Sequence, residues 1–303
     1  MQTIARGVAF TDLLFQGHSR VIATAVLRSP GGVALVDPGP SSCVATLRGS
    51  LARHGTAMTE VRTILLTHIH LDHAGATGTL VREHPQIEVF VHERGAPHMA
   101  DPSRLLKSAA RLYGADMDRL WGEVVPVPAD NLRSLSGGER LTVGDRQLEV
   151  AYTPGHASHH VSYYERESRI AFVGDVAGIR TGPEVFVMPP TPPPDIDLDA
   201  WARSVERLEQ WQPSTLFVTH FGPHGGVANH LQTLLQHLDE ISRTVRRTLE
   251  DDGSDESRIA RFSEEMRRYL RQHLSEAEAT RYEHAVPLAQ CWLGLARYWR
   301  KKG

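Results

Sequence analysis

The chain has little cysteine: Cys43 and Cys291 are the only two among 303 residues, and they lie far apart without any Cys-x-x-Cys arrangement. A disulfide framework, or a structural zinc site built from thiolates, needs several cysteines at defined spacings. The sequence therefore indicates neither, and a metal bound by this chain would rely on nitrogen and oxygen ligands.

Long apolar runs are also missing. No stretch approaches the roughly 20 apolar residues that a membrane-spanning helix needs. The first 25 residues contain Arg6, Asp12 and Arg20 and lack the continuous apolar segment of a signal peptide. We therefore expect no membrane association and a cytoplasmic location.

Neither sign of charge is in large excess. The formal net charge is -3 and 23% of the residues are charged, so the chain as a whole offers no general attraction for a polyanion. We therefore expect a small-molecule substrate and no nucleic-acid partner, while the oligomeric state stays open. A chain of 303 residues can bury one substantial core and carry a smaller second unit.

The most informative feature that is present follows the apolar run Ile64–Leu66. Residues 67–73 read T-H-I-H-L-D-H, which places four ligand-capable groups within six residues. Catalytic zinc sites typically use about three protein ligands, so this cluster exceeds the needs of one ion. His68 and His70 point the same way because side chains alternate with period two, whereas the adjacent Asp72 and His73 diverge. The segment therefore predicts one pair of ligands for each of two metals.

Three further ligand-capable residues each end a short apolar stretch. His156 follows Thr153-Pro154-Gly155, Asp175 follows Phe172-Val173-Gly174, and His220 follows Phe217-Val218-Thr219. A single histidine near a strand end is usually a structural residue, but these three occur together with the cluster at 67–73. Their joint occurrence favours a metal centre.

The combined spacing resembles the metallo-beta-lactamase superfamily of metallohydrolases from about Val21 to His224, with its H-x-H-x-D-H motif followed by a distant His, a bridging Asp and a final His. The resemblance implies a ligand set for each metal and one shared carboxylate. The implied roles are His68, His70 and His156 for the first metal, Asp72, His73 and His220 for the second, and Asp175 as the bridge. The second-site cysteine of the antibiotic-resistance members is absent, which favours the glyoxalase II-like and lactonase-like branches.

Four other residues are candidates for orienting the ligands. Asp37, in Leu35-Val36-Asp37-Pro38-Gly39, could hold the outer ring nitrogen of a ligand histidine, although an Asp before Pro is equally typical of a turn. His159 and His160 follow His156 closely and are expected to be supporting or structural residues rather than ligands. His224, after Gly222-Pro223, is ambiguous in the same way.

Strand-like and helix-like segments alternate along the first three quarters of the chain, which indicates an α/β layered domain. The resemblance implies an αββα two-sheet sandwich at residues 1–228 and a C-terminal helical region at 229–303. Apolar residues at three- and four-residue spacing predict three amphipathic helices after His230.

Two segments interrupt the alternation. Residues 103–121 have helical spacing and could form either a lid over the metals or a surface helix. Residues 188–195 contain five prolines, which enforce an extended loop that could line the substrate entrance or act as a rigid connector.

The expected activity also follows from the resemblance. It implies a dinuclear hydrolase in which a metal-bridging hydroxide attacks the carbonyl of an ester-type substrate, a thioester or a lactone, with Asp72 placed to shuttle a proton. Two divalent ions are expected, zinc first, with iron or manganese also compatible with these ligands. The alternatives are a mononuclear iron enzyme like the persulfide dioxygenases, using His68, His156 and Asp175, a nuclease or phosphoesterase, and a non-enzymatic metal-dependent binding module.

Overall fold

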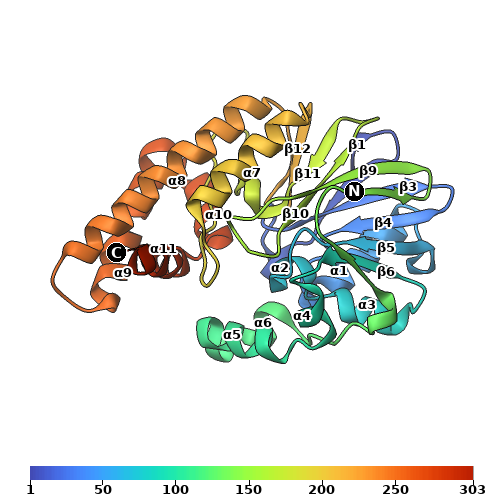
Figure 1. Ribbon diagram of the computed structural model, residues 1–303, viewed down its shortest axis with the longest axis horizontal. Helices are drawn as coiled ribbons and strands as arrows, with labels where there is room; N and C mark the ends of the chain where they lie inside the picture. Colours follow the sequence, from blue (N-terminus) through green and yellow to red (C-terminus); the bar gives the residue numbers. More distant parts are fainter. Residues whose placement is uncertain (303) are drawn as a thin grey trace.

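Two β-sheets packed face to face form the centre of the structure, a computed structural model that describes residues 1–302 (Figure 1). The first sheet has seven strands in the order of the sequence. They are β1 Gln2–Ala5, β2 Val8–Asp12, β3 Ala23–Ser29, β4 Gly32–Val36, β5 Val61–Leu65, β6 Glu88–His92 and β7 Leu132–Leu135. The strands from β1 to β4 pair antiparallel, and those from β4 to β7 pair parallel.

The second sheet has six strands in the order β13-β12-β11-β10-β9-β8. They are β8 Arg140–Val143, β9 Arg146–Tyr152, β10 Val161–Glu165, β11 Ile170–Phe172, β12 Thr215–Val218 and β13 Gly222–His224. Only β11 and β12 pair parallel in this sheet. Both sheets therefore contain parallel and antiparallel pairs. Parallel neighbours need crossover connections, and the helices in these connections cover the outer faces of the sheets.

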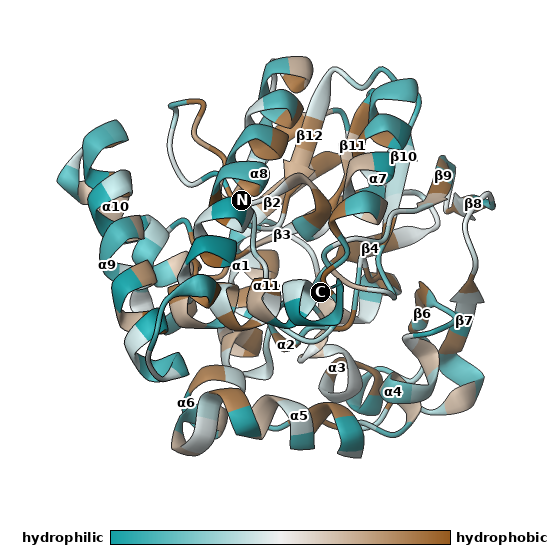
Figure 2. Cartoon of the chain, turned by 60° about the vertical axis from the view of Figure 1, so that its left-hand side comes forward, coloured by the Kyte–Doolittle hydropathy of each residue, from teal (hydrophilic) through white to brown (hydrophobic). Residues whose placement is uncertain are grey.

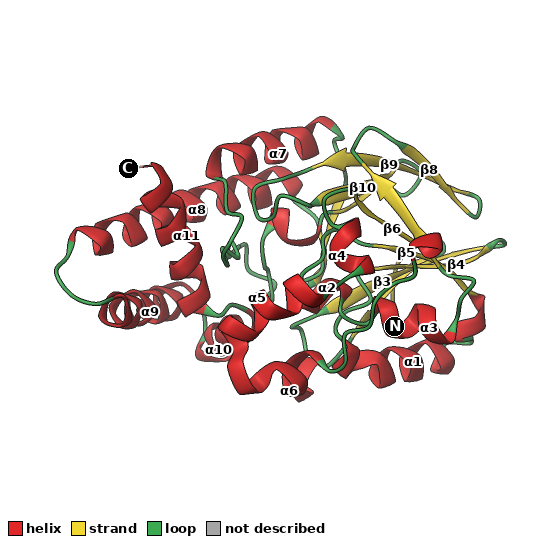
Figure 3. Cartoon of the chain, turned by 60° about the horizontal axis from the view of Figure 1, so that its bottom comes forward, coloured by secondary structure: helices red, strands yellow, loops and turns green. Residues whose placement is uncertain are grey.

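Helices cover both outer faces of the sandwich and extend it at one end (Figure 3). They are α1 Val44–Arg53, α2 Leu71–Ala74, α3 Thr77–Glu83, α4 Ala96–Ala100, α5 Ser103–Tyr113, α6 Met117–Trp121, α7 Leu198–Gln210, α8 Val227–Glu250, α9 Asp255–His273, α10 Glu276–Ala285 and α11 Leu288–Lys302. None of these helices is long and apolar enough to cross a membrane.

Alternating side chains of the strands divide the core into layers. In β3, Ala25 and Leu27 belong to the cluster between the two sheets, whereas Val26 faces the helices outside the first sheet. In β11, Phe172 faces the other sheet and Ala171 the helices outside. This period-two pattern is what a strand buried on both faces requires, and it explains the continuous apolar runs of the sequence.

The C-terminal helices share one apolar cluster with the second sheet. Trp201 of α7, Leu234 of α8 and Trp292 of α11 are buried together with Val218 of β12. Figure 2 shows largely hydrophilic residues on the outward sides of α9 and α10. The predicted αββα sandwich with a C-terminal helical extension is confirmed, while the division at residue 228 stays a prediction and falls just inside α8.

Several elements differ from the sequence prediction. Four helices follow residue 226 instead of three, and the additional one is α10, which buries only Ala279 and Tyr282 and so lacks a marked apolar stripe. The helical segment 103–121 is divided into α5 and α6 at Gly114, whose φ of 52° favours glycine.

Candidate metal centre

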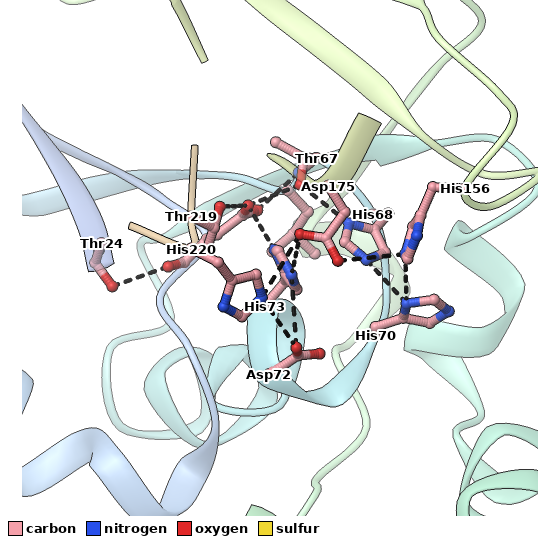
Figure 4. A network of polar contacts seen from close by, with 12 residues as sticks. Thr24, Thr67, His68, His70, Asp72, His73, His156, Asp175, Thr219 and His220 are labelled. Carbon is pink, nitrogen blue, oxygen red and sulfur yellow. Dashed lines mark hydrogen bonds and ion pairs between the residues drawn. The ribbon is translucent and has the colours of Figure 1, made fainter. Parts of the chain in front are cut away.

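The seven predicted ligands come together where strands of both sheets end (Figure 4). The segment after β5 carries His68 and His70 and leads into α2, which holds Asp72 and His73. The other three candidate ligands lie in loops of the second sheet. They are His156 between β9 and β10, Asp175 in the 3-10 turn Gly174–Ala177 after β11, and His220 between β12 and β13.

Four of these residues form a first group. Nδ1 of His70 lies 3.0 Å from Nε2 of His68 and 3.0 Å from Nε2 of His156, and Oδ2 of Asp175 lies 3.4 Å from Nε2 of His156. One ligand atom from each of the four fits within 4.8 Å of the others. The three imidazoles thus direct ring nitrogens at a common point, which is the arrangement of a bound cation's ligands.

Asp72, His73 and His220 form a second group, in which one ligand atom from each residue also lies within 4.8 Å of the others. Oδ2 of Asp72 lies 3.3 Å from Nε2 of His220 and 3.7 Å from Nε2 of His73. Asp175 reaches this group with its other oxygen, because Oδ1 lies 3.2 Å from Nε2 of His73 and 3.6 Å from Nε2 of His220. The carboxylate of Asp175 therefore stands between the two groups, with one oxygen directed at each.

The outer ring nitrogens of three histidines fix the direction of the inner ones. Nδ1 of His73 donates to Oδ2 of Asp37 at 2.8 Å, Nδ1 of His156 to the carbonyl of Pro190 at 2.8 Å, and Nδ1 of His220 to the carbonyl of Val21 at 2.6 Å. Carboxylate and carbonyl oxygens only accept, so Nδ1 carries the proton in each case. Nε2 therefore points inward, and in the neutral imidazole, the form that binds a metal, its lone pair is directed at the space between the residues.

Asp37 connects the centre to the sheets. Its side chain is fully buried and accepts from the main-chain N–H of Thr67 at 2.8 Å and from the hydroxyls of Thr67 and Thr219 at 2.7 and 2.8 Å, in addition to His73. Because the Thr67 hydroxyl donates to Asp37, it accepts from Nδ1 of His68 at 3.1 Å. Asp37 therefore orients His73 directly and His68 through Thr67.

The other three supporting candidates lie at different distances from the centre. The ring centre of His160 is 5.1 Å from that of His68, and its Nδ1 lies 2.9 Å from the hydroxyl of Thr153. His159 has its ring centre 5.7 Å from that of His70. His224 lies on β13, contacts the carbonyl of Arg180 at 3.1 Å and belongs to neither group.

The environment of the first group favours the neutral form of its histidines. Burial, followed by the nearby charges of His73 and other histidines, holds the pKa of His68 well below its usual value. Burial and His156 lower the pKa of His70 to about 4. Neutral imidazole is the form that coordinates a metal, so neither ligand has a proton to lose near neutral pH.

The second group instead attracts positive charge. Burial raises the pKa of Asp72, but His73 and His220 outweigh it and lower that pKa to about 2. Burial lowers the pKa of His73, yet the carboxylates of Asp175, Asp72 and Asp37 raise it well above its usual value. Three buried or half-buried carboxylates thus concentrate negative charge here, which a divalent cation would offset.

The residues present fit divalent cations. Nε2 of His73 and Oδ1 of Asp175 lie 3.2 Å apart, yet both are buried and neither makes a hydrogen bond of good geometry among residues 1–302. Buried polar atoms are normally satisfied, so a cation between them would supply the missing partner. The donors are imidazole nitrogens and carboxylate oxygens, a set that suits zinc, iron or manganese.

Gly174 allows the loop carrying Asp175 to approach the first motif. Its φ is 45°, and a Cβ at this position would lie 2.4 Å from the Thr67 hydroxyl oxygen and 2.9 Å from Nε2 of His160. Any larger residue would displace the Thr67 hydroxyl that links His68 to Asp37. A glycine directly before Asp175 is therefore required by sterics.

A cavity of about 700 Å³ opens onto the centre, and His70, Asp72, His156, Asp175 and His220 form its inner end. Two segments with an undecided role in the sequence line this cavity. They are one face of α5 and the proline-rich loop, through Pro190 and residues 192–194.

The C-terminal region contributes to the same cavity, through residues that no binding motif in the sequence identifies. Gln290 and Cys291 of α11 lie in its wall. The hydroxyl of Tyr113 on α5 donates to Oε1 of Gln290 at 3.1 Å and so joins the two regions. No local pattern signals a contact between residues 177 positions apart.

Fold and site together define an αββα metalloprotein with two adjoining ligand groups. The chain belongs to the metallo-beta-lactamase superfamily, whose family model matches residues 20–220, and the resemblance seen in the sequence is thereby confirmed.

Several curated proteins are similar to parts of the chain. A probable metallo-hydrolase, YqgX of Bacillus subtilis, is 39% identical over 113 residues, 37% of this chain and 48% of that protein. The metallo-beta-lactamase fold-containing protein ST1585 of Sulfurisphaera tokodaii is 29% identical over 163 residues, 52% of this chain and 60% of that protein. A hydroxyacylglutathione hydrolase of Legionella pneumophila is 28% identical over 154 residues, 51% of this chain and 46% of that protein. The matches thus span about half the length of these relatives.

Solved structures show the same fold over longer stretches. The metallo-beta-lactamase family protein TTHA1429 of Thermus thermophilus superposes with a TM-score of 0.74 at 23% identity, covering 99% of this chain and 95% of that one. The ST1585 structure gives a TM-score of 0.62 at 23% identity, over 78% and 87% of the two chains. The first similarity extends the shared fold into the C-terminal helices.

Proposed function

We propose that the protein is a dinuclear metal-dependent hydrolase that cleaves an ester-type carbonyl compound, a thioester or a lactone. The position of Asp175 carries this proposal. One of its oxygens faces the group of His68, His70 and His156, and the other faces His73 and His220. A shared carboxylate is what two neighbouring cations need to offset their mutual repulsion.

Two divalent cations, which we propose to be zinc, would supply Lewis-acid polarisation of a carbonyl and acidification of a water molecule. The first would be held by His68, His70 and His156. The second would be held by Asp72, His73 and His220. Asp175 would contact both. The hydrogen bonds from the outer nitrogens to Asp37, Pro190 and Val21 keep the imidazoles in place for this role.

Asp72 is placed to move a proton during the reaction. Its Oδ2 faces His220 and His73, its side chain is 25% exposed, and it lines the cavity (Figure 4). With Oδ2 engaged, the second carboxylate oxygen is available at the cavity wall. His73 and His220 keep this carboxylate anionic, so it can accept a proton from an attacking water and pass it to the leaving oxygen or sulfur.

One comparison supports an ester-type substrate. Similar proteins include a hydroxyacylglutathione hydrolase, a name that denotes thioester cleavage. Tyr113 lines the cavity with Asp72, and burial and the charge of Asp72 raise its pKa, so it is a neutral phenol. Its one proton is donated to Gln290, so its oxygen can only accept a hydrogen bond from a substrate.

The main alternative function is that of a mononuclear iron oxygenase that uses His68, His156 and Asp175. It would leave the second group without a role, although Asp72, His73 and His220 also converge within 4.8 Å. The test compares zinc-loaded and iron-loaded protein on a panel of thioesters and lactones, with an oxygen electrode beside the product assay.

We expect zinc-loaded protein to hydrolyse at least one of the two substrate classes, thioesters or lactones, without oxygen. The Asp72→Asn variant should lose most of this activity. Thr142→Val, on β8 at the far side of the second sheet, is the matched control and should behave as wild type. Stoichiometric oxygen uptake by the iron form, with the zinc form inert, would move the chain to the oxygenase class.

A further inference from the structure

One face of α5 borders the cavity and also packs partly against the core. The lining residues recur at the spacing of a single helical face. They are Arg104, Leu105, Ser108, Ala109, Leu112 and Tyr113. Ala109 belongs to a core cluster, and Leu105 and Tyr113 pack on that cluster but remain partly exposed, as does Leu112. The exposed part of this apolar face is available for a ligand.

The end of the cavity near the C-terminus of α5 is closed by aromatic rings. Trp121 stacks on Phe15 with ring centres 5.6 Å apart, and Tyr113 meets Trp121 edge-on at 4.9 Å. The hydrogen bond from Tyr113 to Gln290 closes the wall between α5 and α11. This end therefore presents mainly apolar surface.

Charged side chains line other parts of the cavity. Arg94 and Arg104 are among them, and so is Asp195, whose carboxylate accepts a hydrogen bond from the hydroxyl of Ser158. Glu283, an acid of the wall, is already paired with Arg271. The cavity thus has an apolar end at Tyr113 and Trp121, and its charged side chains lie elsewhere in the wall.

We propose that the substrate carries a long apolar acyl group that lies along α5, with its chain end at Tyr113 and Trp121. This proposal rests on the proposed function, since the acyl carbonyl would sit at the metal centre. The lining face from Arg104 to Tyr113 extends for about 14 Å at 1.5 Å per residue. An acetyl group would leave most of the 700 Å³ cavity unfilled, whereas a medium or long chain would cover the apolar wall.

The expected effect follows from the transfer of methylene groups out of water. Each additional methylene that enters the cavity should raise kcat/KM about threefold to fourfold. The increase from a butanoyl to an octanoyl ester would be on the order of 100-fold. The gain should stop when the chain reaches the aromatic end.

The test uses the full metal-loaded chain and straight-chain thioesters of one neutral thiol, from acetyl to dodecanoyl. Titration calorimetry with the matching carboxylates gives a second measure, because affinity for the product does not depend on turnover. Two neighbouring alanines of α5 supply a matched pair. Ala109 lines the cavity, whereas Ala110 is exposed and does not.

We expect Ala109→Trp to lower the octanoyl-to-acetyl ratio of kcat/KM at least tenfold and Ala110→Trp to leave it unchanged. Leu112→Trp is a second blocking variant in case Ala109→Trp fails to fold, which metal content and circular dichroism would show. Hydrolysis with a flat dependence on chain length, in both kinetics and calorimetry, would overturn the acyl-site proposal and leave the proposed function intact. No hydrolysis, with carboxylate affinity still rising with chain length, would overturn the proposed function but support the cavity as an acyl site.

Discussion

Asp37 offers a sharp test of how the metal centre is held. Its buried carboxylate accepts four hydrogen bonds, from the N–H and hydroxyl of Thr67, from Nδ1 of His73 and from the hydroxyl of Thr219. Asp37→Ala removes every acceptor at once. Each buried donor left unsatisfied costs about 1–3 kcal/mol, and breaking a buried charged pair typically costs about 3–5 kcal/mol.

Four donors at the lower figure already amount to about 4 kcal/mol, so we expect Asp37→Ala to lower the free energy of unfolding by about 4 kcal/mol or more, a large part of a typical domain's stability. Asp37→Asn keeps the shape and can retain the three bonds to one oxygen, but it sets an amide N–H against that of Thr67 and removes the charge facing His73. Its cost should be about 1–3 kcal/mol. Metal affinity should fall about 10-fold to 100-fold, because the partner that orients a ligand is weakened.

Stability is measured by urea unfolding of the metal-free protein, and affinity by competition with a chelator. Thr24→Val is the matched control, since the Thr24 hydroxyl donates to the main-chain carbonyl of Asp37 at 2.9 Å and not to its carboxylate. It should cost about 1 kcal/mol and leave metal affinity unchanged. An Asp37→Asn variant with wild-type affinity for both metals would refute the role assigned to His73 and its partner.

Three further variants test other parts of the centre. Asp175→Ala should weaken binding of both metals, whereas His70→Ala should mainly remove the first, as metal analysis would show. Gly174→Ala should lower the free energy of unfolding by about 1–3 kcal/mol or more, and by more than Gly226→Ala does. Both glycines have positive φ, but only Gly174 lacks room for a Cβ. Tyr113→Phe should cost about 1 kcal/mol in urea unfolding through loss of its bond to α11, with unchanged metal content.

The candidate ligand set stays a prediction, and the sequence could propose it because its chemistry is concentrated in short segments. His68, His70, Asp72 and His73 lie within six residues after a strand, and His156, Asp175 and His220 each end an apolar run. Strand alternation and helix periodicity likewise indicated the layered fold. Helix α10 was not predicted because it buries few side chains and so lacks an apolar stripe. Ser275 and Glu278 nevertheless form a capping box, which is a sequence signal for the start of this helix.

The cavity could not be predicted, because its walls come from distant parts of the chain. Tyr113 and Gln290 are 177 positions apart, and their contact depends on how α11 packs on the sandwich. The histidine that Asp37 orients could not be identified from the sequence for a similar reason. It is His73, 36 residues away, brought close because β4 and β5 pair in parallel and the chain turns back after β5.

Metal stoichiometry tests the dinuclear account most directly. Wild-type protein is stripped, reconstituted with zinc, freed of excess metal and analysed by inductively coupled plasma mass spectrometry against protein concentration. Two ligand groups that share Asp175 predict about two zinc ions per chain. A value that stays at one per chain under saturating zinc would contradict the account and leave Asp72, His73 and His220 without the role assigned to them.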